Sequence, residues 1–77
     1  MEIQQFIENF KAQFDEPGAV LFTAETKFRD IDEWSSLMAL SIIAMVDSEY
    51  HVKIKGDDIR NSRTIYDLYV LVKSRMK

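Results

Sequence analysis

The chain has 77 residues and a hydrophobic fraction of 47%, which predicts one domain over residues 1–77 with a packed core and argues against disorder. It contains no cysteine, which excludes disulfides, thiolate metal sites and a cysteine nucleophile, so any thiol that it uses must be borrowed from another molecule. The net charge of −3, with basic residues spread thinly over the last third of the chain, argues against a nucleic-acid binder.

Three segments carry apolar residues at positions i, i+3, i+4, i+7 and i+11, a spacing that predicts three principal amphipathic helices. The first covers residues 2–14, and its apolar positions are Ile3, Phe6, Ile7, Phe10 and Phe14. This helix should end near Phe14, because the following Asp15-Glu16-Pro17-Gly18 combines a proline with a glycine, and both disfavour further helix.

Residues 15–34 are predicted to form a long loop between the first two principal helices. This loop carries many large apolar side chains, namely Val20, Leu21, Phe22, Phe28, Ile31 and Trp34. Burial of each large apolar side chain contributes about 1.5 to 3 kcal/mol, so several of them should be anchored on the helices. The loop is therefore expected to be ordered.

The second helix is predicted for residues 36–50, directly after Trp34 and Ser35, and either Ser35 or Ser36 is expected to cap it. Its inward stripe should consist of Ala39, Ile42, Ile43, Val46 and Tyr50. The opposite side then holds Ser41 and Ser48, flanked by Leu37, Leu40, Ala44 and Met45. These extra apolar residues have two explanations: a central helix that is surrounded on all sides, or a docking face for partners beside Ser36.

The last third of the chain is predicted to contain an extended connection and two helices. Residues 51–55 alternate like a strand but have no partner strand, and a short helix is expected near residues 57–61. The last helix is predicted for residues 64–76, since Thr64 followed by Asp67 forms a short capping box. Its inward positions are Ile65, Leu68, Tyr69, Val72 and Met76. The fold class is therefore all-α: a small four-helix bundle of three principal helices and one short helix, with a long ordered loop.

Charge is divided unevenly along the chain. Residues 1–50 hold three basic and ten acidic side chains, whereas residues 51–77 hold seven basic and three acidic ones. The acidic front is expected to attract basic partner surfaces. The N-terminus lacks a basic segment followed by an apolar one, and no apolar run has the length of a membrane span, so a cytoplasmic protein is expected.

The sequence argues against an enzyme. His51 is the only histidine and is expected to face solvent, and no Gly-x-Ser-x-Gly elbow is present, so a serine nucleophile lacks its usual partners. Several carboxylates lack the spacing of a metal-binding loop and are interpreted as a solvated acidic surface: Asp30, Asp32, Glu33, Asp47 and Glu49. No catalytic residue and no metal ligand is therefore expected.

The segment Phe28-Arg-Asp-Ile-Asp-Glu-Trp-Ser-Ser-Leu-Met-Ala-Leu resembles the region around the modified serine of acyl carrier proteins, whose usual core is Asp-Ser-Leu. The resemblance extends over nearly the whole chain and includes Ile54 in the connection and Thr64 at the start of the last helix. The chain departs from the family at Ser35, where an aspartate is usual. It also departs at positions where many members carry acids, namely Met38, Ser41 and Ser48.

The resemblance implies that Ser36 carries 4'-phosphopantetheine, derived from coenzyme A and attached by a phosphopantetheinyl transferase. A hydroxyl in the first turn of a helix suits this role, because it faces solvent beside amide groups without intrahelical partners. Proteins of this kind are monomeric phosphoproteins of lipid metabolism that hold acyl groups as thioesters. They present these groups to acyl-transferring and acyl-processing enzymes of fatty acid or secondary-metabolite synthesis.

The partner-binding residues that the resemblance suggests are Leu37, Leu40, Ala44 and Asp47. The weak acidity of the second helix favours a dedicated carrier for a secondary pathway. Two alternatives stay open: an aminoacyl or peptidyl carrier, and an unmodified helical interaction module that grips another helix with the face formed by Leu37, Leu40 and Ala44.

Overall fold

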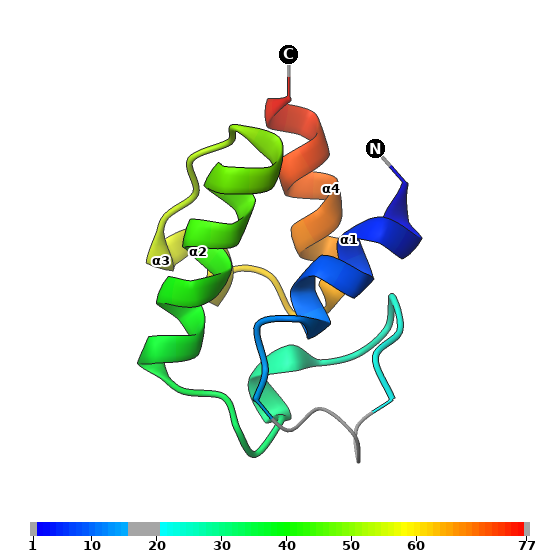
Figure 1. The fold of residues 1–77 in the computed structure, drawn as a ribbon, viewed down its shortest axis with the longest axis vertical. Helices are drawn as coiled ribbons and strands as arrows, with labels where there is room; N and C mark the ends of the chain where they lie inside the picture. The colour runs from blue at the N-terminus through cyan, green and yellow to red at the C-terminus, as the bar shows by residue number, and fades with distance from the viewer. Residues whose placement is uncertain (1, 16–20, 77) are drawn as a thin grey trace.

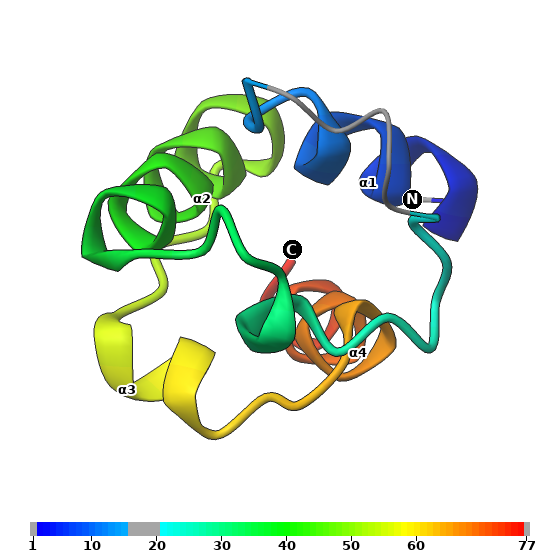
Figure 2. The ribbon, with the colours of Figure 1, turned by 90° about the horizontal axis from the view of Figure 1, so that it is seen from below.

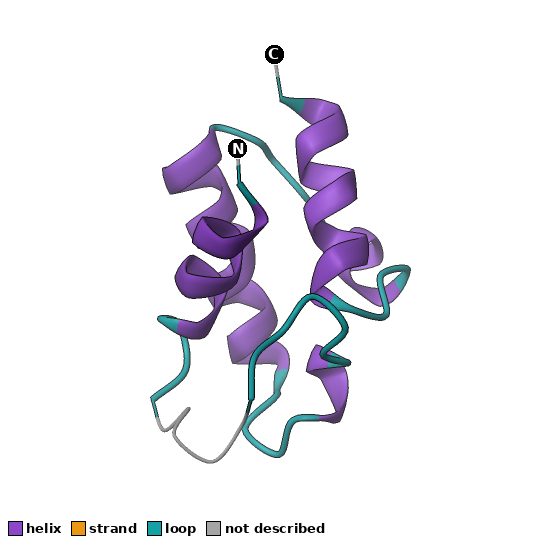
Figure 3. Ribbon diagram, turned by 90° about the vertical axis from the view of Figure 1, so that its right-hand side faces the viewer, coloured by secondary structure: helices purple, strands orange, loops and turns teal. Residues whose placement is uncertain are grey.

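The computed structural model describes residues 2–15 and 21–76, and within these residues it is all-helical without a strand (Figures 1 and 3). Its helices are α1 (Ile3–Lys11), the 3-10 helix η2 (Phe28–Asp30), α2 (Ser36–Tyr50), α3 (Gly56–Arg60) and α4 (Ile65–Arg75). The radius of gyration is 11.2 Å, against about 11.5 Å expected for a compact chain of this length. The all-α class and the four predicted α-helices are confirmed, and the helices form a compact globule.

The helices pack so that α1 contacts both α2 and α4, while α3 contacts α2. In Figure 1, α2 and α4 rise in the same direction and α1 runs the other way. Figure 2 views the molecule from the end at which α2 and α4 begin, and the segment with η2 crosses this end. The start of α2, with its two serines, therefore lies at the end that this segment covers. No helix in the described part of the chain is long and apolar enough to span a bilayer.

The start of α4 has partners for its free amide groups. Thr64 Oγ1 accepts a hydrogen bond from the Asp67 N–H at 3.1 Å, and the Asp67 carboxylate accepts one from the Thr64 N–H at 3.2 Å. This confirms the predicted capping box. The next two N–H groups, those of Ile65 and Tyr66, donate to the carbonyls of Thr26 and Ala24 at 3.1 and 2.9 Å. The segment before η2 is therefore fastened to the first turn of α4.

The core is rich in aromatic rings, and the predicted inward faces of α1 and α4 are largely confirmed. The buried apolar residues of these two helices and of the turn after α1 are Phe6, Ile7, Phe10, Phe14, Ile65, Leu68, Tyr69 and Val72. Phe28 of η2 joins them, with its ring centroid 5.4 Å from that of Phe10. The expectation for Met76 is wrong: it lies beyond the end of α4 and is 37% exposed.

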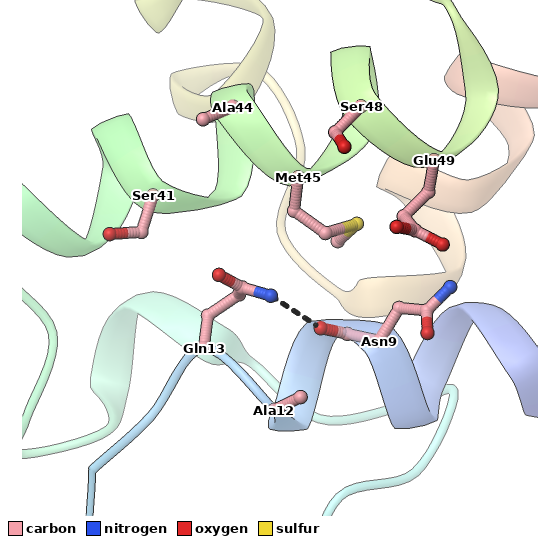
Figure 4. A pocket seen from close by; sticks show the side chains of 8 residues that line it. All are labelled: Asn9, Ala12, Gln13, Ser41, Ala44, Met45, Ser48 and Glu49. Carbon is pink, nitrogen blue, oxygen red and sulfur yellow. Dashed lines mark hydrogen bonds between the residues drawn. The ribbon is translucent and has the colours of Figure 1, made fainter.

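The buried face of α2 differs from the predicted one. The buried residues are Met38, Ile42, Met45 and Val46, whereas Ala39, Ile43 and Tyr50 are only partly buried against the core. Met45 was expected on the outward side, and this is wrong. Figure 4 shows its side chain pointing from α2 toward α1, in a hollow that Ser41 and Ser48 also line. The buried face of α2 includes Met45 because α2 packs against α1 on that side of the helix.

The loop expected for residues 15–34 contains η2, and it is anchored by some of the predicted side chains. Phe28 is fully buried, and Phe22, Ile31 and Trp34 are partly buried against the core. Leu21 is not anchored: it is 83% exposed. Val20 and the predicted stop signal at residues 16–18 lie outside the described residues. The regular part of α1 ends at Lys11, and hydrogen-bonded turns follow to Phe14.

The connection after α2 is extended, as predicted, and it leads into α3. His51 has φ 57° and ψ 36°, the left-handed conformation that often ends a helix, and its side chain is exposed. Val52 and Ile54 are buried on alternate positions. The Lys55 N–H then donates to the Asp58 carboxylate at 2.8 Å, which caps α3.

The ion pair between Asp58 and Arg75 should make stability depend on pH. Hydrogen bonds from Arg75 and then from the Lys55 N–H lower the pKa of the Asp58 carboxyl. A carboxyl with a lower pKa in the folded state stabilises the fold above its unfolded-state pKa, and this stabilisation is lost as pH falls through the folded-state pKa. Asp58→Asn should therefore lower the free energy of unfolding at neutral pH, with a difference from the parent that shrinks below about pH 4.

Urea unfolding at a series of pH values measures this difference. Arg75→Gln removes the other side chain of the same pair and should reduce the pH dependence in the same direction. A difference between Asp58→Asn and the parent that stayed constant from neutral to acid pH would contradict the role given to the ion pair.

Candidate functional site

The two neighbouring serines occupy different positions in the structure. Ser35 is the N-cap of α2, with extended backbone angles, and its Oγ accepts a hydrogen bond from the Met38 N–H at 3.3 Å. Ser36 is the first residue of the helix. Its side chain is exposed, and its hydroxyl makes no hydrogen bond with any residue in the described part of the chain. The sequence left the cap open between the two serines, and the structure assigns it to Ser35.

This assignment predicts unequal effects of two alanine substitutions on stability. Ser35→Ala should lower the free energy of unfolding by about 1 kcal/mol, because the Met38 N–H loses its acceptor. Ser36→Ala should leave it close to the parent value, since that hydroxyl caps nothing. Chemical denaturation of the two unmodified variants measures the difference. A larger loss at Ser36 than at Ser35 would show that the caps are assigned the wrong way round.

Trp34 fixes the chain immediately before the serines. The ring centroid of Trp34 lies 5.1 Å from that of Phe28, and the backbone N–H of Trp34 donates to the Ile31 carbonyl at 2.9 Å. A partly buried ring, packed on Phe28, and a turn therefore hold the backbone that enters α2. The position of Ser36 is therefore fixed by the packing of Trp34 on the core, and the preceding loop is not free to move it.

The residues predicted for the site share one exposed side of α2. Leu37 and Leu40 are 74% and 60% exposed, and Ala44 and Asp47 are also exposed. At about 100° per residue Ser36 and these four lie within a sector of about 100°, opposite the buried side of the helix. Two large apolar side chains in water next to an unengaged hydroxyl are typical of a surface that contacts another molecule.

A groove of about 540 Å³ adjoins Ser36, between α2, α3 and the segment with η2. It is lined by Arg29, Trp34, Ser35, Ser36, Ala39, Leu40, Ile43, Gly56, Ile59 and Arg60. Apolar side chains form much of its wall, and two arginines, Arg29 and Arg60, also line it. Sequence reasoning missed this groove and both arginines, because the groove exists only where α3 packs against α2. The one signal for it was the surplus of apolar residues on α2.

The structure separates Ser36 from the only histidine. His51 follows the last residue of α2, so the two lie at opposite ends of a helix about 22 Å long. They do not form a pair of nucleophile and base. The described residues also contain no group of three or more His, Asp or Glu side chains placed to hold a metal ion.

Comparisons with models of protein families, with curated proteins and with solved structures found no match to this chain. The resemblance to acyl carrier proteins therefore remains a proposal. Its support comes from the residues and geometry around Ser36.

Proposed function

We propose that this protein is an acyl carrier protein that holds acyl groups as thioesters on a 4'-phosphopantetheine arm at Ser36. It presents these groups to acyl-transferring and acyl-processing enzymes of fatty acid or secondary-metabolite synthesis. A monomeric, cytoplasmic working form belongs to the same proposal, as does a single carrier domain over residues 1–77. The observation that carries it is the division of roles between two serines, of which one caps α2 and the other is left exposed.

The surroundings of Ser36 fit a covalently attached phosphopantetheine. The hydroxyl is exposed and unengaged, so it can be esterified without breaking a hydrogen bond of the fold. The groove beside it offers apolar side chains for the arm. The group would supply a thiol for acyl attachment, which this cysteine-free chain lacks. The chain itself holds the attachment point in place through Trp34 and the start of α2.

Partner enzymes are proposed to contact the exposed side of α2 at Leu37, Leu40, Ala44 and Asp47. The two exposed leucines follow the attachment point on the same exposed side of α2, so a partner that covers them also receives the arm. An aminoacyl or peptidyl carrier would use the same residues, because the attachment chemistry is the same.

The same exposed leucines support a second candidate, an unmodified interaction module that binds a helix of another protein. Incubation with coenzyme A and a broad-specificity phosphopantetheinyl transferase separates the two functions. The intact mass of a carrier should increase by one phosphopantetheinyl group for each chain. An unchanged mass would favour the interaction module and overturn the carrier proposal.

A further inference from the structure

Two cations line the groove beside Ser36 without an acidic neighbour in it. Arg29 belongs to η2 and Arg60 is the last residue of α3, so separate elements bring them to one groove. Among the described residues that line this groove, none is acidic. On α2 itself the first carboxylate is Asp47, about three helical turns after Ser36. The charged residues that line the groove are therefore both basic, in a protein whose net charge is negative. Carboxylates lie close by outside it: Asp57 pairs with Arg60, and Asp30 lines the next hollow together with Arg29.

Both guanidinium groups are available to another anion. Arg29 makes no ion pair with any residue that the structure describes. Arg60 pairs with Asp57, but the two side chains are 68% and 74% exposed. An ion pair so open to water contributes little to stability, so Arg60 can exchange it for a second anion. A structural role in the core is excluded for both, because both residues are exposed.

We infer that Arg29 and Arg60 form an anion-binding pair that receives an oxyanion carried on Ser36. This inference rests on the proposed function. The oxyanion has two possible sources, the phosphodiester that attaches the arm and a carboxylate on the cargo, and a guanidinium group binds either one through two parallel hydrogen bonds. The phosphodiester would hold the arm against the groove. A cargo carboxylate would make the groove selective for acidic acyl groups over plain alkyl chains.

The arginine side-chain N–H resonances test the inference directly. They are recorded by NMR on the unmodified protein and again after complete conversion, which intact mass verifies. The signals of Arg29 and Arg60 should shift on conversion if these side chains bind the phosphodiester, and only after loading of an acidic cargo if they bind its carboxylate. The signals of Arg63 and Arg75 should stay in place. Arg63 does not line the groove beside Ser36 but two other hollows, one of which it shares with Lys27, Arg29 and Asp30, and Arg75 is engaged by Asp58.

Loading of the arm distinguishes the two sources. Shifts that appear with the bare arm identify the phosphodiester. Shifts that appear only with a succinyl cargo, and not with a butanoyl cargo of the same length, identify a cargo carboxylate. Unmoved Arg29 and Arg60 signals in all three forms would overturn the inference.

A second measurement uses the phosphorus resonance of the modified protein. If the phosphodiester is the bound oxyanion, contact with Arg29 and Arg60 should make its chemical shift depend on salt concentration, and the double variant Arg29→Gln, Arg60→Gln should lose this dependence. Arg63→Gln is the matched control and should keep it. A mass that does not increase overturns the proposed function and this inference together. Complete modification without any response of Arg29 and Arg60, with the bare arm and with either cargo, overturns the inference alone.

Discussion

Ser36→Ala should abolish the attachment of phosphopantetheine and leave the fold intact. The side chain of Ser36 is exposed and outside the hydrogen bonds of the fold, so its loss removes the site of modification and little else. Ser35 cannot substitute for it, because its Oγ is the acceptor that caps α2 and it lies outside the first turn. Intact mass after incubation with coenzyme A and a broad-specificity transferase should match the unmodified variant.

Ser35→Ala is the matched control for this experiment. It should still gain one phosphopantetheinyl group, more slowly than the parent because the start of α2 is less firmly held. Full labelling of Ser36→Ala would mean that another residue carries the group. Loss of labelling in Ser35→Ala with full labelling of Ser36→Ala would move the site to Ser35.

Ile42→Ala should lower the free energy of unfolding by about 2 to 5 kcal/mol, the usual cost of removing a fully buried aliphatic side chain. Ile42 is 0% exposed and lies on the face of α2 that packs against the core. Total stability for a chain of this length is about 4 to 12 kcal/mol, so this one change removes a large share of it. Urea unfolding followed by far-UV circular dichroism measures the loss.

The next residue provides the matched control. Ile43 has the same side chain but is only partly buried, and it lines the groove beside Ser36. Ile43→Ala should therefore cost clearly less than Ile42→Ala. Equal losses, or a greater loss at Ile43, would show that α2 is rotated from its orientation in this structure.

The sequence predicted α1 well because this helix has one apolar face. The inward positions of α4 were also predicted correctly apart from Met76, although Tyr66 and Val70 leave apolar side chains on its exposed side. On α1, the spacing of Phe6, Ile7 and Phe10 leaves only one side that can enter the core, and all three are buried. On α2 apolar residues surround the helix, so the spacing alone could not decide which of them face inward. The packing of α1 decided it, and Met38 and Met45 were buried in place of Ala39 and Ile43.

In the candidate site, too, the sequence predicted the features set by local pattern and missed those set by packing. The position of Ser36 at the first turn of α2, and the exposure of Leu37 and Leu40 beside it, follow from local pattern and agree with the structure. The choice of Ser35 as the cap needed the backbone angles, because either hydroxyl could serve by sequence. Arg29 and Arg60 are 31 positions apart, and only the packing of η2 and α3 around α2 brings them to one groove.

The hydrogen bonds from the start of α4 to the carbonyls of Ala24 and Thr26 limit how the groove can move. If the segment before η2 swung away, the N–H groups of Ile65 and Tyr66 in the first turn of α4 would lose their acceptors, so this motion costs two hydrogen bonds. The wall that carries Arg29 and Trp34 is therefore stiff. The opposite wall is α3, five residues held by buried Ile59 and by a partly exposed ion pair. We therefore expect the groove to widen for a larger ligand by displacement of α3, while the segment with Arg29 and Trp34 stays in position.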